Sequence, residues 1–107
     1  MKHIAATNAL FALGHTTRLS VFRLLVQAGR SGRLPSDLAA ALDLPGATLS
    51  FHLKALAAAG LITSEQQGRT IRYQADFDAM NALVGYLTEN CCAGDQGDCR
   101  PSTSCTP

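Results

Sequence analysis

The chain has 107 residues, of which 47% are apolar and 16% are charged, and its formal net charge at pH 7 is +1. This length allows one domain with a single modest core, and the composition is typical of a soluble globular protein. No apolar run approaches the roughly 20 residues of a membrane helix, and the first ten residues lack a signal-peptide pattern, so we expect a cytoplasmic protein with no membrane partner.

Helical spacing predicts two helices in the first part of the chain. The first covers residues 4–13 and ends at Gly14. The second is expected to be capped by Thr16 or Thr17, whose hydroxyl can accept an otherwise unpaired backbone N–H, and to reach Ala28. Its apolar positions recur at helical intervals: Leu19, Phe22, Leu25 and Val26.

Two further helices follow after a glycine-containing loop. Pro35 suits the first turn of the third helix, because its missing N–H has no partner to lose there. The apolar positions of this helix recur every four residues: Leu34, Leu38 and Leu42. Pro45 and Gly46 break the pattern, and a fourth helix that ends at Gly60 has apolar residues at offsets 0, 4 and 7: Leu49, Leu53 and Leu56.

The period of the pattern changes after the fourth helix. Residues 61–64 and 70–73 are β-prone and flank a turn signal at Gln67 and Gly68, which predicts one β-hairpin. Asp76 is the expected N-cap of a last helix with its own apolar positions: Phe77, Met80, Leu83, Val84 and Leu87. The predicted fold is mainly α with one β-hairpin, and its element order matches a winged helix-turn-helix.

Charge and cysteine are unevenly distributed along this order of elements. Residues 1–75 carry eight Lys or Arg against three Asp or Glu, whereas residues 76–107 carry one against five. The basic part favours a polyanionic partner. All four cysteines fall in the last 17 residues, which is typical of metal ligands or redox groups and not of a secreted disulfide scaffold. We therefore expect a domain at 1–90 and a flexible, cysteine-bearing, inducer-binding tail at 91–107.

The fourth helix has a side suited to double-stranded DNA opposite its leucine stripe. Ser50 and Lys54 can donate to base edges or phosphates, while Thr48 and His52 on the flanks are predicted to reach phosphates. Two apolar residues complete the predicted DNA-binding face: Ala47 and Phe51. In the hairpin, the predicted phosphate contacts are Arg69 at the tip and Arg72 on the second strand. By spacing alone, the same residues also fit an ordinary solvated helix and exposed arginines.

Several short motifs resemble the ArsR/SmtB metalloregulatory repressors. Residues 50–56 and 59–62 match the family pattern S-x-H-L-x-x-L followed by A-G-L-[IV], and residues 17–19 resemble its second-helix opening. Residues 68–69 with 72–73 resemble its wing. The resemblance spans roughly residues 4–90. It implies a transcriptional repressor that is a homodimer through its first and last helices and blocks a promoter until an inducer binds.

The chain departs from that family at two familiar sensor sites. Its third helix has no thiol where many members carry Cys-x-Cys, and its last helix has no histidine where zinc-sensing members place ligands. The remaining candidate for the inducer site is the tail, and residues 89–92 resemble those of a subgroup of arsenical-resistance repressors. Soft thiolates select thiophilic ions, so we predict that trivalent arsenic (arsenite) or antimony is the inducer and that no organic cofactor is used. The predicted ligands are Cys91, Cys92 and Cys99.

Other interpretations of the thiols remain open at this point. A different soft or divalent metal is one alternative; zinc prefers four ligands in a tetrahedron, and Cys105 offers a fourth. Thiol oxidation would instead give a redox-responsive repressor. Two alternatives come from other functional classes. The first is a protein that only binds metal, which would not account for the helix-turn-helix pattern. A thiol-dependent arsenic-handling enzyme would need a base beside its thiol or a C-x-x-C pair. This sequence offers neither, so we expect no enzymatic activity.

Overall fold

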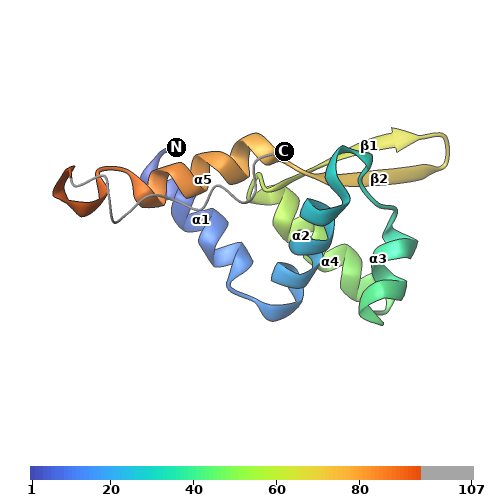
Figure 1. Cartoon of the computed structure of the whole chain (residues 1–107). Helices are drawn as coiled ribbons and strands as arrows, with labels where there is room; N and C mark the ends of the chain where they lie inside the picture. Colours follow the sequence, from blue (N-terminus) through green and yellow to red (C-terminus); the bar gives the residue numbers. More distant parts are fainter. Residues whose placement is uncertain (95–107) are drawn as a thin grey trace.

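A computed structural model describes residues 1–94 of the chain. In this part it has five α-helices, one antiparallel hairpin and two short 3₁₀ turns (Figure 1). In chain order the elements are α1 His3–Leu13, α2 Thr16–Ala28, η1 Gly29–Ser31, α3 Pro35–Leu42, α4 Gly46–Ala58, β1 Ile62–Gln67, β2 Thr70–Ala75, α5 Phe77–Thr88 and η2 Cys91–Gly94. The predicted mainly α fold with one hairpin is confirmed.

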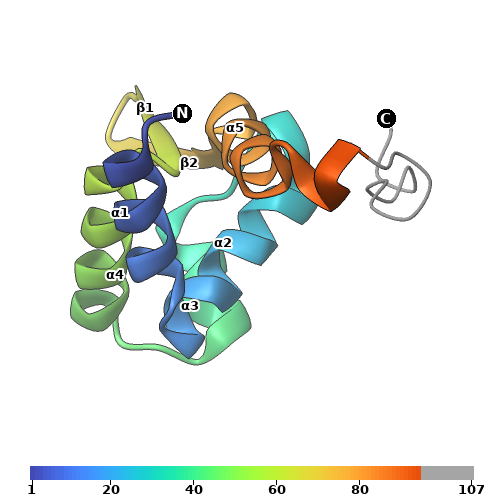
Figure 2. The same ribbon diagram turned by 90° about the vertical axis from the view of Figure 1, so that its left-hand side faces the viewer.

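The core lies where α2, α3 and α4 meet beneath α1 and the base of the hairpin. The three leucines predicted for the inner side of α4 are almost fully buried, and Leu25, Leu38 and Leu61 pack into the same cluster. The fully buried side chains of α1 are all small: Ala6, Ala9 and Ala12. Because alanine lets helix backbones approach closely, α1 fits against both α2 and α4 (Figure 2).

Not every apolar residue at helical spacing in α2 is buried. Val21, Phe22 and Leu25 are the buried residues of this helix, while Leu19 keeps 43% of its surface exposed. At 100° per residue, Leu19 is turned well away from the centre of that buried set. The helix predicted from this spacing is confirmed, whereas Leu19 lies outside its buried side.

Helix α2 also has a different N-cap from the one predicted. The cap residue is His15, and its Nδ1 accepts the Thr17 backbone N–H at 3.1 Å. An imidazole nitrogen in this position fills the role expected of a threonine hydroxyl. At the other end of the fold the prediction is confirmed, since Asp76 caps α5 by accepting from the Ala79 N–H at 3.0 Å.

The hairpin is fastened to the segment that joins α2 to α3. The Arg33 N–H donates to the Tyr73 carbonyl at 2.8 Å, and the Tyr73 N–H donates back to Arg33 at 2.9 Å. The approach is close because Gly32 has a φ of +65° and no side chain; a Cβ there would collide with the Tyr73 carbonyl oxygen. The base of the wing is thus held by backbone hydrogen bonds and its turn at Gly68 projects away from the helices (Figure 1).

A side-chain contact joins the N-terminal end of α1 to the C-terminal part of α5. The His3 Nδ1 lies 2.6 Å from the Tyr86 hydroxyl oxygen, and the two rings meet edge to face at 5.9 Å.

Within residues 1–94, no single helix has the length and apolar character to cross a bilayer. α1 and the segment Thr16–Ser31 together have enough length and apolar character, but this pair is bent by 103°.

Candidate nucleic-acid interface

α3 and α4 form the two helices of a helix-turn-helix. α3 ends at Leu42, its C-cap Asp43 adopts a left-handed backbone with φ of 53°, and Pro45 immediately precedes α4. The turn between the helices is therefore only a few residues long. This geometry directs one side of α4 into the core and leaves its other side in solvent.

The exposed side of α4 holds most of the side chains predicted to meet DNA. All of the following are exposed: Ala47, Thr48, Ser50, Phe51 and Lys54. Ser50 and Lys54 stand one helical turn apart, so their donors share one stripe of the surface. A helix with short polar and basic side chains on its outer face is suited to the major groove, where base edges and phosphates accept hydrogen bonds.

His52 is not on the exposed flank of α4, so that prediction is wrong. Only 6% of its surface is exposed. Its Nδ1 accepts a hydrogen bond from Arg18 Nε at 3.2 Å, and the His15 ring centroid lies 4.8 Å from its own. Burial, then the nearby charges of His15 and Arg18, lower the pKa of His52 below its usual value. Because an arginine Nε–H can only donate, His52 Nδ1 is the acceptor in its hydrogen bond with Arg18.

Arg18 joins the interface from a different helix, and sequence reasoning did not single it out as a site residue. Its guanidinium carbon lies 5.6 Å from the Phe51 ring centroid, within the range of a cation–π contact. The Phe51 and His52 rings also meet edge to face, at 5.7 Å. The contact between Arg18 and His52 spans 34 positions, and no periodic pattern within either helix signals it.

The two arginines of the wing differ in their surroundings. Arg69 follows Gly68 in the exposed turn of the hairpin, as predicted. Arg72 is half-buried, and its guanidinium donates to the Ser31 carbonyl at 2.9 Å and to Gln67 Oε1 at 3.3 Å. Arg72 thus helps to fasten the wing to the loop after α2, whereas Arg69 extends from its tip.

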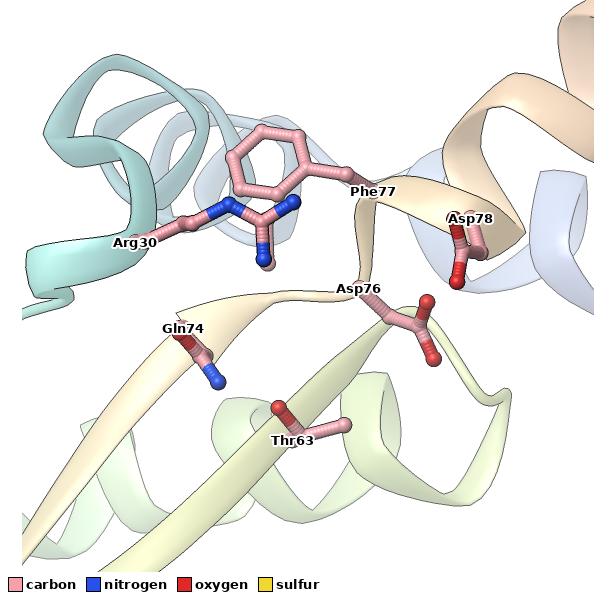
Figure 3. A pocket seen from close by; sticks show the side chains of 7 residues that line it. Arg30, Thr63, Gln74, Asp76, Phe77 and Asp78 are labelled. Carbon is pink, nitrogen blue, oxygen red and sulfur yellow. The ribbon is translucent and has the colours of Figure 1, made fainter.

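A polar hollow of about 210 Å³ lies where the hairpin meets α5. Figure 3 shows its labelled lining residues: Arg30, Thr63, Gln74, Asp76, Phe77 and Asp78. None of the side chains predicted to bind DNA or metal lines it, and the Asp76 carboxylate is already used as the α5 cap. The candidate interface is therefore the α4 surface and the wing, and not this hollow.

Two of the three predicted metal ligands fall within the described residues. Cys91 is exposed and Cys92 half-buried, both in the turn η2 that follows α5. This turn and the tip of the wing lie at opposite ends of the molecule (Figure 1). Cys99, together with Cys105, lies outside the described residues. Within residues 1–94, no group of three His, Cys, Asp or Glu side chains is placed to hold a metal ion.

Comparison with known proteins identifies the family. A helix-turn-helix domain model matches residues 13–65. The arsenical resistance operon repressor of Bacillus subtilis strain 168 is 33% identical over 91 residues, which cover 82% of this chain and 83% of that protein. The chain belongs to the ArsR/SmtB family. This match confirms the resemblance inferred from the motifs. Members of the family are transcriptional regulators and not enzymes.

Other ArsR/SmtB proteins agree with this assignment. The transcriptional repressor SmtB of Mycobacterium tuberculosis H37Rv is 37% identical over 70 residues, 65% of this chain, and the chain spans about half of that relative's length (50%). An ArsR-like regulator from Rhodococcus sp. RHA1 superposes with a TM-score of 0.70 at 32% identity, covering 79% of this chain and 77% of that one. A homodimeric winged helix-turn-helix domain from Mycobacterium bovis gives 0.65 at 27% identity and 80% coverage of both chains.

Proposed function

We propose that this ArsR/SmtB-family repressor binds double-stranded operator DNA as a homodimer and is released by trivalent arsenic or antimony held on cysteine thiolates. The observation that carries the first half is the exposed side of α4, which is polar and basic while its inner side completes the core. Ser50 and Lys54 are the proposed donors to base edges and nearby phosphates, Thr48 contacts phosphate, and Ala47 permits close approach. Arg69 neutralises a phosphate beside the groove.

The proposed dimer forms through α1 and α5. Both helices leave large apolar side chains in water: Ile4, Leu10, Phe11, Val84 and Leu87. Phe11 and Ile4 retain 81% and 70% of their surface, which is unusual for a monomer unless another surface covers them. The homodimeric M. bovis domain supports this arrangement. Two copies of α4 then lie about one helical turn of DNA apart, roughly 34 Å, and meet successive major grooves.

The proposed inducer site uses Cys91, Cys92 and Cys99, in a tail that begins where α5 ends. Two adjacent thiols and a third seven residues on can supply three sulfurs to a trivalent ion, and closing so short a loop costs little entropy. The exposed position of Cys91 fits such a site because a metalloid can reach it. The relative from B. subtilis, named for arsenical resistance, favours this chemistry. Zinc binding and thiol oxidation are the competing explanations for the tail.

Induction then acts on the dimer and not on the DNA-contacting side chains. Tying the tail to the end of α5 changes the orientation of the α5 pair and moves the two α4 helices away from the spacing that the operator requires. A coupling free energy of about 1–3 kcal/mol per site is enough to change operator occupancy substantially.

The decisive test is fluorescence anisotropy on a labelled duplex from the chain's own promoter, under reducing conditions. Arsenite is titrated into the complex, with Zn²⁺ in a parallel titration. Release by arsenite at low stoichiometry, and not by Zn²⁺, supports both halves of the proposal. Binding without release by arsenite contradicts the proposed inducer, and absence of binding contradicts the DNA-binding role.

Cysteine variants separate the two roles in the same assay. Cys91→Ser and Cys92→Ser should bind the promoter duplex as the original chain does but resist release by arsenite, because each removes one of three sulfurs. Cys105→Ser is the matched control and should respond normally. Loss of DNA binding in Cys91→Ser would contradict the division of labour between α4 and the tail.

A further inference from the structure

Phe51 is an unusual side chain for the outer face of α4. Its ring keeps 62% of its surface in solvent, although its neighbours on that face are small, polar or basic. Exposing an aromatic ring of that size forgoes the burial free energy that a core phenylalanine such as Phe22 gains. A bound ligand that covers the ring would recover this burial free energy.

The ring is also held in one position in the absence of DNA. The Arg18 guanidinium lies over it at 5.6 Å and the His52 ring packs edge-on at 5.7 Å. Arg18 is in turn fixed by its Nε hydrogen bond to His52. Two side chains, Arg18 from α2 and His52 from α4, therefore restrain one exposed ring, which reduces the entropy lost when it makes a contact.

A ring presented on a helix in the major groove meets one apolar feature there. Among the four bases, only thymine carries a methyl group on its major-groove edge, and phenylalanine is one of the side chains that contact it. We propose that Phe51 reads the 5-methyl group of a thymine in each operator half-site, and that Arg18 and His52 are positioning residues that hold its ring for this contact. The inference rests on the proposed binding of operator DNA through α4.

The direct test removes the methyl group and nothing else. Duplexes of the footprinted promoter site, with single thymines replaced by deoxyuridine, are compared with the thymine duplex by anisotropy. At one thymine per half-site we expect the original chain to bind about fourfold more weakly, the equivalent of about 0.8 kcal/mol for one buried methyl group. Phe51→Ala should bind the thymine duplex more weakly and show no preference between the two duplexes.

The positioning role is tested by a matched pair at His52. His52→Asn keeps an acceptor near the place of Nδ1, whereas His52→Leu fills similar volume with none. We expect His52→Asn to retain the thymine preference and His52→Leu to lose most of it, with Arg18→Gln behaving like His52→Leu. Thermal melts establish that each variant is folded. If His52→Leu is folded and keeps the full preference, the positioning role is wrong.

The outcomes distinguish this inference from the function on which it rests. If the original chain binds no promoter duplex, the proposed DNA-binding function fails. If it binds with equal affinity to thymine and deoxyuridine duplexes at every position, only the methyl contact fails. If Phe51→Ala dissociates the dimer in sedimentation measurements, the ring belongs to a protein interface and the inference is overturned.

Discussion

The helices α4 and α5 differ in what covers their apolar side chains. α4 places three leucines in a core built by its own chain, whereas α5 buries only Leu83 fully and leaves Val84 and Leu87 exposed. The half of the molecule that we propose faces DNA is thus packed within one chain, whereas the α1–α5 half leaves apolar side chains uncovered. The two halves should therefore respond differently to the same kind of substitution.

Truncating a buried leucine should give the largest effect. Leu56→Ala, in a side chain with no exposed surface, should lower the free energy of unfolding by about 4 kcal/mol, because it removes buried methyl groups and leaves a cavity. Urea denaturation at several protein concentrations measures it. Leu87→Ala is the control: its loss should be smaller and should fade as the protein is diluted. Equal losses at all concentrations would remove the contrast between the two helices.

Adding a methyl group at Gly32 should test the anchoring of the wing within the protomer. Gly29 and Gly32 have similar positive φ values, 69° and 65°, but only Gly32 faces an obstructing carbonyl. Gly29→Ala should cost about 2 kcal/mol for its backbone alone, and Gly32→Ala about 3 kcal/mol. Urea midpoints of the two variants give the difference. If Gly29→Ala costs as much as Gly32→Ala, the close approach to Tyr73 is not what holds the wing.

Removing the charge at the wing tip should weaken operator binding without affecting the fold. Arg69→Ala should reduce affinity and lower the slope of log affinity against log salt concentration by about 1 for each phosphate that the arginine neutralises. Anisotropy titrations at four salt concentrations measure the slope, with the exposed Arg23 of α2 replaced by alanine as control. An unchanged slope in Arg69→Ala would exclude a phosphate contact by the wing.

The smallest expected effect is a pH dependence that originates at His52. Burial, with the charges of His15 and Arg18, lowers its pKa in the folded chain below the ordinary value of 6.5. The unfolded chain therefore takes up a proton first as pH falls, so stability is full above about pH 7 and declines below 6.5. Urea midpoints from about pH 7.5 to about pH 5.5 should follow this decline, and His52→Asn should flatten it. A steeper decline in the variant would contradict the assignment.

The sequence predicted the helix-turn-helix well because its elements depend on local signals. Leucines at offsets 0, 4 and 7 specify the inner side of α4. Pro35 and Asp76 mark helix starts, and Pro45 marks the break between α3 and α4. His52 lies about 60° from Leu49 on the helix wheel, at the edge of the leucine stripe. Its burial depends on His15 and Arg18, which come from another part of the chain. Contacts between distant segments, such as Arg18 with His52, leave no periodic trace in either segment.

The pairing of His3 with Tyr86 has a consequence for the order of synthesis. These residues are separated by 83 positions, so α1 leaves the ribosome long before its partner α5 exists. In the meantime α1 can pack its alanines on α2 and α4, which arise earlier and belong to the DNA-facing half. The surface shared by α1 and α5 is therefore complete only after α5 has been synthesised, whereas the helices of the other half are already present.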